Sequence, residues 1–220
     1  MVEGTGLVAA AFEQHWDVEA VFLAAGHQWE APMAVPTYEL GPGVIERVAS
    51  TDTPQPVMAV VRRKASSLEE LRGKSFVLVG DRITDPGNAG TMLRSAEAAG
   101  ADAVVFTDGS VDVFNPKVVR SSAGALFNVP VVVDVALTDV LALDGYRSWG
   151  TSSHQGSAYT TLDWRGPTML VLGNEAHGLP DDAPVDGWVT IAHVGRAESL
   201  NVAMAATVLV FEVARQRSAR

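Results

Sequence analysis

The chain has 220 residues, of which 47% are hydrophobic and 19% charged, the composition of an ordinary globular protein. At about 100–200 residues per domain, this length allows one large domain or two small ones. Cysteine is absent, which excludes disulfides, thiolate metal sites and a cysteine nucleophile. The formal net charge of -10 argues against a protein that coats nucleic acid electrostatically, so any nucleic-acid contact must be a local basic patch on an acidic body.

The first part of the chain predicts a small α/β domain. Residues 4–14 are compatible with a helix, residues 21–23 and 57–61 have the apolar character of strands, and prolines and glycines interrupt the chain between residues 32 and 43. The interval 63–73 is polar and begins with basic residues, so we interpret it as a linker between two domains.

From residue 76 onward, short apolar runs alternate with segments of helical length. Strands are predicted at 76–79, 103–106, 129–133, 169–172 and 188–191, and helices at 88–99, 116–126 and 198–215. This alternation predicts a mostly parallel sheet with helices on both faces. In the first of these helices, Asn88 is the expected N-cap, Gly100 the expected stop, and Asn88 and Arg94 are expected to face one side.

Several common functional motifs are missing. The sequence contains no G-x-x-x-x-G-K-[ST], no dinucleotide-binding glycine fingerprint and no G-x-S-x-G elbow. The five histidines show no metal-ligand spacing, so no metal site is expected. No apolar run approaches the about 20 residues of a membrane span. The first residues lack the pattern of a signal peptide, and we expect a cytoplasmic protein with no membrane association.

Three segments place polar residues and glycines at predicted strand ends or helix starts: 85–94, 170–180 and 197–206. Ligands in open α/β sheets bind beyond the carboxyl ends of the strands. Each segment alone also fits a capped helix or an ordinary turn, and it is their order and spacing that carry information.

Taken together, the three segments resemble the SpoU/TrmH family of RNA ribose 2′-O-methyltransferases. Asn88 and Arg94 are similar to its first motif, Gly173-Asn174-Glu175 with Gly178 to its second, and Ser199-Leu200-Asn201 to its third. The segment 115–127 also matches a family stretch. The resemblance covers about residues 74–215, and residues 2–62 are similar to the family's accessory, ribosomal-protein-like domain.

The resemblance implies a domain organisation and a fold. Residues 1–62 would form an RNA substrate-binding domain that is short at its N-terminus, residues 63–73 a linker, and residues 74–220 a SPOUT methyltransferase domain. That C-terminal domain would be α/β with a mostly parallel sheet and a deep trefoil knot, one of the rare exceptions to unknotted topology. A homodimer through the knot region is also implied, in which each active site borrows residues from the partner.

The implied cofactor is S-adenosylmethionine, with S-adenosylhomocysteine as product. The loops after residues 150, 172 and 191 would hold it in a bent conformation. Its expected binding residues are Thr151, Ser152, Ser153, Leu172, Gly173, Asn174, Glu175, Gly178, Ile191, Ala192, Val194, Ser199, Leu200 and Ala205. The family's third motif is commonly preceded by Ile-Pro, whereas this chain has Ile191-Ala192-His193, a departure that we expect to tune the cofactor loop.

The implied chemistry is displacement of a methyl group from a sulfonium by a ribose 2′-oxygen. Arg94 would be either the proton acceptor or, more consistent with a guanidinium that has no acceptor capacity while charged, a clamp for phosphate and developing oxyanion. Asn88 and Asn201 would orient the ribose or Arg94. Glu175 would position the substrate or its own loop, and Ser199 would accept or relay a hydrogen bond.

Ribosomal RNA is the favoured substrate, because the tRNA guanosine enzymes of this family tend to lack the accessory domain. Candidate RNA contacts are Arg62, Arg63, Lys64, Arg82, Lys117, Arg120 and Ser122. Two alternatives stay open: a tRNA 2′-O-methyltransferase, and a cofactor-binding RNA-interaction protein with little catalysis. Base methylation is disfavoured, because such knotted enzymes lack the Asn/Arg pairing of the first motif.

Overall fold

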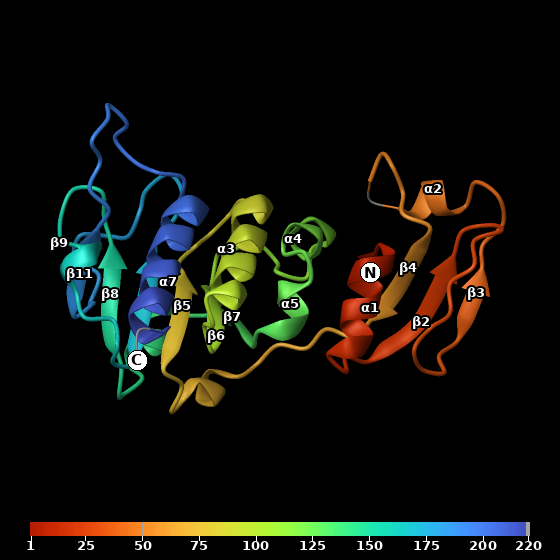
Figure 1. Cartoon of the computed structure of the whole chain (residues 1–220), viewed down its shortest axis with the longest axis horizontal. Helices are drawn as coiled ribbons and strands as arrows, with labels where there is room; N and C mark the ends of the chain where they lie inside the picture. The colour runs from red at the N-terminus through yellow and green to blue at the C-terminus, as the bar shows by residue number, and fades with distance from the viewer. Residues whose placement is uncertain (50, 219–220) are drawn as a thin grey trace.

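In the computed structural model, which describes residues 1–49 and 51–218, the chain forms two regions, each built on its own β-sheet (Figure 1). The first region contains β1 (Val2–Glu3), α1 (Thr5–Glu13), β2 (Val18–Leu23), β3 (Thr37–Glu39), α2 (Ile45–Val48) and β4 (Val57–Val61). Its sheet has the order β1-β4-β2-β3, with β4 antiparallel to β1 and β2, and β3 parallel to β2. The predicted strands at 21–23 and 57–61 and the predicted helix at 4–14 are confirmed.

The second region alternates strands and helices. It contains η1 (Leu68–Leu71), β5 (Phe76–Gly80), α3 (Pro86–Ala98), β6 (Ala103–Thr107), α4 (Pro116–Ser121), α5 (Ala125–Asn128), β7 (Val131–Val135), α6 (Leu137–Leu141), β8 (Arg147–Thr151), β9 (Ser157–Ala158), η2 (Tyr159–Thr161), β10 (Thr168–Leu172), β11 (Gly187–Thr190) and α7 (Val202–Ser218). The strands pair in the order β7-β6-β5-β10-β8-β11-β9, and every pairing is parallel. The predicted parallel sheet is therefore confirmed.

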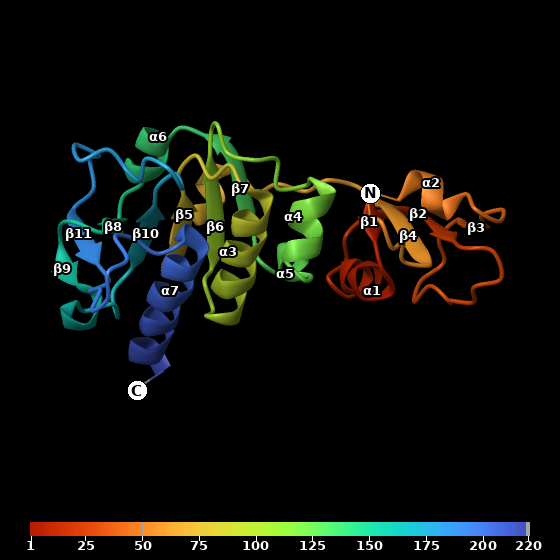
Figure 2. The same cartoon turned by 90° about the horizontal axis from the view of Figure 1, so that it is seen from above.

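The central strands β5, β6 and β10 are buried along their whole length, which is why they read as continuous apolar runs. One face of this sheet packs against α3, α4, α5 and α7, with Met92 and Leu209 in the same core. The opposite face packs against η1 and α6 through Leu71 and Val140. Figure 2 shows α6 on the side of the sheet away from α3 and α7.

Helix α3 begins two residues before the predicted start. The Asp85 carboxylate accepts a hydrogen bond from the Asn88 backbone N–H at 2.8 Å, and Pro86 occupies the first helical position. Asn88 is therefore inside the first turn, and its assignment as the N-cap was wrong. A carboxylate followed by proline at N1 is a strong helix start, since neither residue needs an intrahelical N–H bond there.

Two other predicted helices differ from the structure. The segment 116–126 is split into α4 and α5, because Ala123 and Gly124 adopt positive φ values of 51° and 95°. The last helix begins at Val202 instead of residue 198, since the Asn201 side chain caps it and the preceding residues form a loop. The strands β1, β3 and β9 were missed because each has only two or three residues.

The two regions contact each other directly. The Trp16 indole N–H donates to the Phe127 carbonyl at 3.1 Å, and the two rings meet edge to face with centroids 5.2 Å apart. The connection at 63–73 is also ordered, because the Ser66 N–H bonds to the Val131 carbonyl and Leu71 is buried. The first region therefore packs against α5 of the second region. Among the described helices, none is long and apolar enough to cross a membrane.

Candidate functional site

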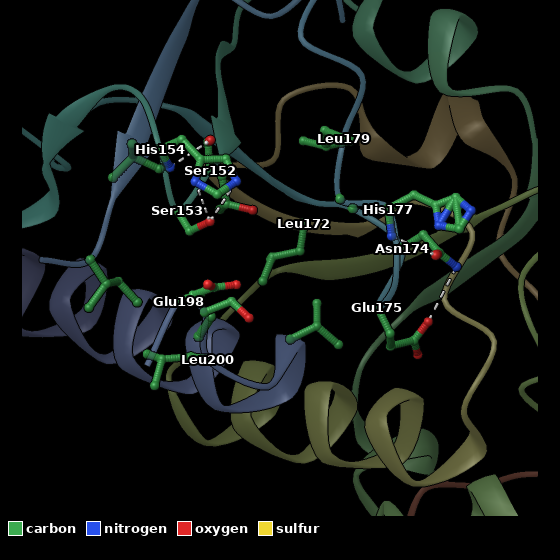
Figure 3. Close-up of a pocket in the computed structure, with 18 of the residues that line it drawn as sticks. Ser152, Ser153, His154, Leu172, Asn174, Glu175, His177, Leu179, Glu198 and Leu200 are labelled. Carbon is green, nitrogen blue, oxygen red and sulfur yellow. Dashed lines mark hydrogen bonds between the residues drawn. The ribbon is translucent and has the colours of Figure 1, made fainter. Parts of the chain in front are cut away.

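A cleft of about 360 Å³ lies at the carboxyl ends of β8, β10 and β11, beside the start of α7 (Figure 3). Parallel strands present their loops at one edge of the sheet, which is why segments far apart in the chain meet there. Leu172 lies between the loop that carries Ser153 and the loop that carries Glu175 (Figure 3). Of the expected cofactor-binding residues, those that line the cleft are Thr151, Ser152, Ser153, Leu172, Gly173, Asn174, Glu175, Gly178, Ile191, Ser199, Leu200 and Ala205.

Two expected cofactor-binding residues lie elsewhere. Ala192 lines a neighbouring hollow on the other side of the loop that follows β11. Val194 lines neither cavity, and its side chain is fully exposed. Of the three residues expected from this loop, Ile191 lines the cleft and the other two do not.

The loop after β10 is held by its own residues. A Cβ at Gly173 would lie 2.2 Å from the Gly178 carbonyl carbon, so only glycine allows the loop to close on itself. The Asn174 side-chain oxygen accepts from the Ala176 and His177 N–H groups, and its amide donates to the Arg82 carbonyl at 2.8 Å. Asn174 therefore joins this loop to the loop after β5.

The Glu175 carboxylate is the centre of a hydrogen-bond network. It accepts from the Thr84 N–H and hydroxyl at 3.1 Å, from the Asp85 N–H at 3.0 Å and from the Asn88 side-chain amide at 3.1 Å. Partial burial of the carboxylate tends to raise its pKa, but these hydrogen bonds outweigh that effect and hold the pKa of Glu175 below its usual range. Glu175 is therefore a fixed anion that secures the start of α3.

Asn88 connects this network to α7. The Asn201 amide donates to the Asn88 side-chain oxygen at 2.9 Å, while the Asn201 oxygen accepts from the N–H groups of Ala203 and Met204. Both groups of the Asn88 amide are engaged, since its nitrogen donates to Glu175. Asn88 is thus bonded to Glu175, 87 residues away, and to Asn201, 113 residues away. These two residues come from the other two segments singled out in the sequence.

Arg94 lies apart from this network. Six residues at about 100° each place it about 120° around the helix from Asn88, so the expectation that the two face one side is corrected. Ser95, rather than Arg94, faces α7, where its hydroxyl bonds to Thr207 at 2.7 Å. Arg94 is exposed, lies outside the cleft and makes no hydrogen bond or ion pair within the described part of the chain.

The arrangement can be compared with known proteins. The model of the SpoU rRNA Methylase family matches residues 75–211, which is more than half of the chain. The chain belongs to this family.

Curated relatives agree with that assignment. The chain is 34% identical to the 23S rRNA (guanosine(2553)-2′-O)-methyltransferase RlmP of Bacillus subtilis, over 97% of this chain and 87% of the relative. It is 32% identical to the 23S rRNA (uridine(2479)-2′-O)-methyltransferase of Streptomyces viridochromogenes, over 99% of this chain and 83% of the relative.

Solved structures of methyltransferases also match nearly the whole chain. The SpoU methyltransferase AviRb of Streptomyces viridochromogenes, in complex with AdoMet, superposes with a TM-score of 0.88 at 30% identity, covering 99% of this chain and 89% of AviRb. An AdoMet-bound rRNA methyltransferase of Sinorhizobium meliloti superposes with a TM-score of 0.86 at 27% identity, covering 97% and 85%.

Among the basic residues expected to contact RNA in this SpoU methylase, three are engaged by acidic neighbours. Arg62 pairs with Asp17 at 2.8 Å and Glu19 at 2.7 Å. Arg63 pairs with Asp112 at 3.2 Å. Arg82 pairs with the buried Asp81 at 3.0 Å, in a left-handed backbone conformation with φ 52°.

The remaining expected RNA contacts differ in accessibility. Lys64 and Lys117 are exposed, and Arg120 is half-buried near the end of α4. Ser122 is fully buried and donates its hydroxyl to the Val119 carbonyl at 2.8 Å, so its assignment as an RNA contact was wrong. A serine that has no exposed area and satisfies its hydroxyl within the helix has a packing role.

The cleft also contains residues that sequence reasoning missed. His154, His177, Asp181, His193 and Glu198 line it although none was expected to bind the cofactor; His177 and Glu198 lie within the segments 170–180 and 197–206. His193 is notable because its Nε2 is buried and is the sole such side-chain atom without a hydrogen-bond partner in the described chain. The available signal was its place two residues after Ile191, in the loop that the family resemblance assigns to the cofactor. The described residues include no cluster of His, Asp and Glu that could hold a metal ion.

Proposed function

We propose that this SpoU methylase transfers the methyl group of S-adenosylmethionine to a ribose 2′-hydroxyl of ribosomal RNA. The observation that carries the proposal is that hydrogen bonds join Asn88 and Asn201 to Glu175, which lines the cleft, in a chain of this family. Relatives whose names state 23S rRNA 2′-O-methylation match nearly the whole chain, and these support ribosomal RNA over tRNA. Because ribosomal RNA is the proposed substrate, we place the protein in the cytoplasm.

The residues of the cleft fit the cofactor. Leu172, Ile191 and Leu200 provide apolar walls, and the loops that surround them offer backbone N–H and C=O groups. His193 also lines the cleft, and its buried Nε2 has no hydrogen-bond partner among the described residues. S-adenosylmethionine, when bound, supplies the electrophilic methyl group, and the chain contributes binding and alignment.

We assign two kinds of role to the side chains of the site, positioning and charge stabilisation. Asn88, Glu175 and Asn201 are saturated with mutual hydrogen bonds, which supports a role as positioning residues. Ser199 lines the cleft, where its hydroxyl would accept or relay a hydrogen bond. Arg94 carries a free guanidinium that would clamp an RNA phosphate and stabilise the developing oxyanion, with proton acceptance as the alternative role.

We also propose that residues 74–220 form a SPOUT domain with a deep trefoil knot, and that residues 1–62 bind RNA. The strand order supports the knot, because β10 inserts between β5 and β8 although it follows both in the chain. Lys64, Lys117 and Arg120, together with Arg62, Arg63 and Arg82, are the proposed phosphate contacts.

A homodimer through this region is part of the proposal. Met204, Val208 and Phe211 on α7 are exposed by 63%, 38% and 48%, and their spacing places them on one helix face. An exposed apolar stripe of this kind is typical of a protein interface. Since Arg94 lies outside the cleft of its own chain, a two-fold dimer would let Arg94 of the partner subunit complete each site.

The test is calorimetric titration of S-adenosylmethionine into the purified protein, with and without ribosomal RNA, followed by a methylation assay. The expected results are one cofactor per chain and a product nucleotide that resists alkaline cleavage on its 3′ side. Binding of the cofactor without methyl transfer would favour the RNA-interaction alternative. No binding under either condition would refute the proposed function.

A further inference from the structure

The segment 115–127 matches a family stretch, yet none of its residues is among those of the described chain that line the cleft. It forms α4 and α5, which lie between α3 and the first region (Figures 1 and 2). Asn115 caps α4 by accepting from the Lys117 N–H at 2.9 Å, and Pro116 occupies the first helical position. The start of α4 is therefore secured by its own sequence.

The end of α4 lies directly against the start of α3. A Cβ at Gly90 would lie 1.9 Å from the Ser121 Oγ and 2.8 Å from the Ser122 backbone nitrogen, so only glycine allows the two helices to approach this closely. The Ser121 hydroxyl donates to the Pro86 carbonyl oxygen at 3.0 Å and shares its proton with two carbonyl oxygens of its own helix. Steric fit and a hydrogen bond thus join α4 to α3 at one place.

The residues of this contact flank Asn88 in the sequence. Pro86 precedes Asn88 by two residues, and Gly90 follows it by two. The Glu175 carboxylate bonds to the same turn, through the Asp85 N–H at 3.0 Å and the Asn88 side-chain amide at 3.1 Å. A shift of this turn would change both hydrogen bonds, and the packing of α4 restricts such a shift.

We propose that Ser121 is a positioning residue for methyl transfer, because together with Gly90 it fixes the start of α3 and hence the place of Asn88. This inference rests on the proposed function, since it assigns Ser121 a part in that reaction. A serine at a helix end that bonds only within its own helix has a packing role, as Ser122 does through the Val119 carbonyl. Ser121 differs because its hydroxyl also reaches a second helix.

Cofactor binding should not depend on this contact. The cleft-lining residues of the described chain come from β8, β10, β11, the loops after these strands and α7, and none comes from α3 or α4. The transfer step should depend on it, because a displaced positioning group lowers the rate even when the substrates are bound.

The test compares Ser121→Ala with Ser122→Ala, a matched change at the same helix end. Ser121→Ala should lower the single-turnover rate, with ribosomal RNA and S-adenosylmethionine both saturating, by about fivefold, the effect of one hydrogen bond. Ser122→Ala loses a bond within α4 and should keep the rate within about twofold. Both variants should bind S-adenosylhomocysteine with unchanged affinity in calorimetric titration.

A second pair of variants tests the close approach of the helices. Gly90→Ala places a methyl group against Ser121 and should lower the rate by about 100-fold. Adding Ser121→Gly removes the Oγ and Cβ that this methyl group would meet, so the double variant should be faster than Gly90→Ala alone by about fivefold or more.

A spectroscopic readout separates positioning from general stability. The Thr84 and Asp85 N–H groups donate to Glu175, so their amide resonances report on the start of α3. Both resonances should shift in Ser121→Ala and keep their positions in Ser122→Ala.

An unchanged methylation rate for Ser121→Ala would overturn the inference, as would an equal loss of rate in Ser122→Ala or a double variant no faster than Gly90→Ala. A parallel loss of S-adenosylhomocysteine affinity in Ser121→Ala would also overturn it, because it would show a general structural defect. Absence of methyl transfer by the unmodified protein would instead refute the proposed function itself.

Discussion

Two sets of residues that are expected to act at the cleft differ in how many hydrogen bonds they make within the chain. Asn88, Glu175 and Asn201 form a closed set in which each side chain bonds to another or to backbone N–H groups. Arg94 and His193 are left free, one exposed on α3 and the other buried in the loop before α7. The closed set holds three segments together, while the exposed guanidinium of Arg94 is available to a bound molecule. This difference indicates which residues position and which bind.

The strongest test of this comparison is Arg94→Ala. Loss of a group that stabilises charge in the transition state should lower the single-turnover methylation rate by about 100-fold to 1000-fold. The melting temperature should change little, because the guanidinium makes no contact within the described chain. An unchanged methylation rate for Arg94→Ala would show that Arg94 takes no part in methyl transfer. A clearly lower melting temperature would show that Arg94 stabilises the fold, as Asn88, Glu175 and Asn201 do.

The proposed dimer is tested at the apolar face of α7. Phe211→Asp introduces a charge on an exposed aromatic position and should weaken self-association by at least about tenfold, measured by analytical ultracentrifugation. Val48→Asp, at a comparably exposed apolar residue of the first region, is the control and should leave association unchanged. A monomeric unmodified protein would contradict the dimer.

Glu175→Gln probes the closed set. An amide has one acceptor oxygen where the carboxylate has two, so the free energy of unfolding should fall by about 1 kcal/mol, a value reduced for solvent exposure. The lowered pKa of Glu175 means that its stabilising effect is present above its unfolded pKa and disappears as pH falls through the folded pKa. The difference between the two proteins in urea unfolding should therefore be largest near pH 7 and shrink below pH 4.5. A difference that grows in acid would contradict this.

The smallest expected effects concern the basic surface. Lys117 is exposed and has no ion-pair partner in the described chain, so Lys117→Ala should weaken RNA binding a few-fold and reduce its salt dependence. Arg62 is shared between Asp17 and Glu19, so Arg62→Ala should weaken RNA binding less. Fluorescence anisotropy at two salt concentrations measures the RNA affinity of both variants and its salt dependence. A larger loss for Arg62 would show that its ion pairs open on binding.

Most of the second region was predictable because its signals are local. Strands β5, β6 and β10 are buried along their whole length and each carries a continuous apolar run, and sequence analysis found all three. The boundaries of α3 and α7 were misplaced, since they depend on caps: Asp85 at one start and Asn201 at the other. Strand β8 carries no apolar run, because it contains Arg147, Ser148 and Gly150, and it is buried through its place between β10 and β11.

The sequence by itself determined the alternation of strands and helices, the three polar segments and their resemblance to a methyltransferase family. Those features depend on composition, spacing and residue type. Tertiary structure alone decided that Glu175 and Asn201 both bond to Asn88, that Ser122 is buried, and that His193 keeps a free nitrogen. The physical reason is that hydrogen-bond satisfaction and burial depend on neighbours distant in the chain, and these are set by the order of strands in the sheet.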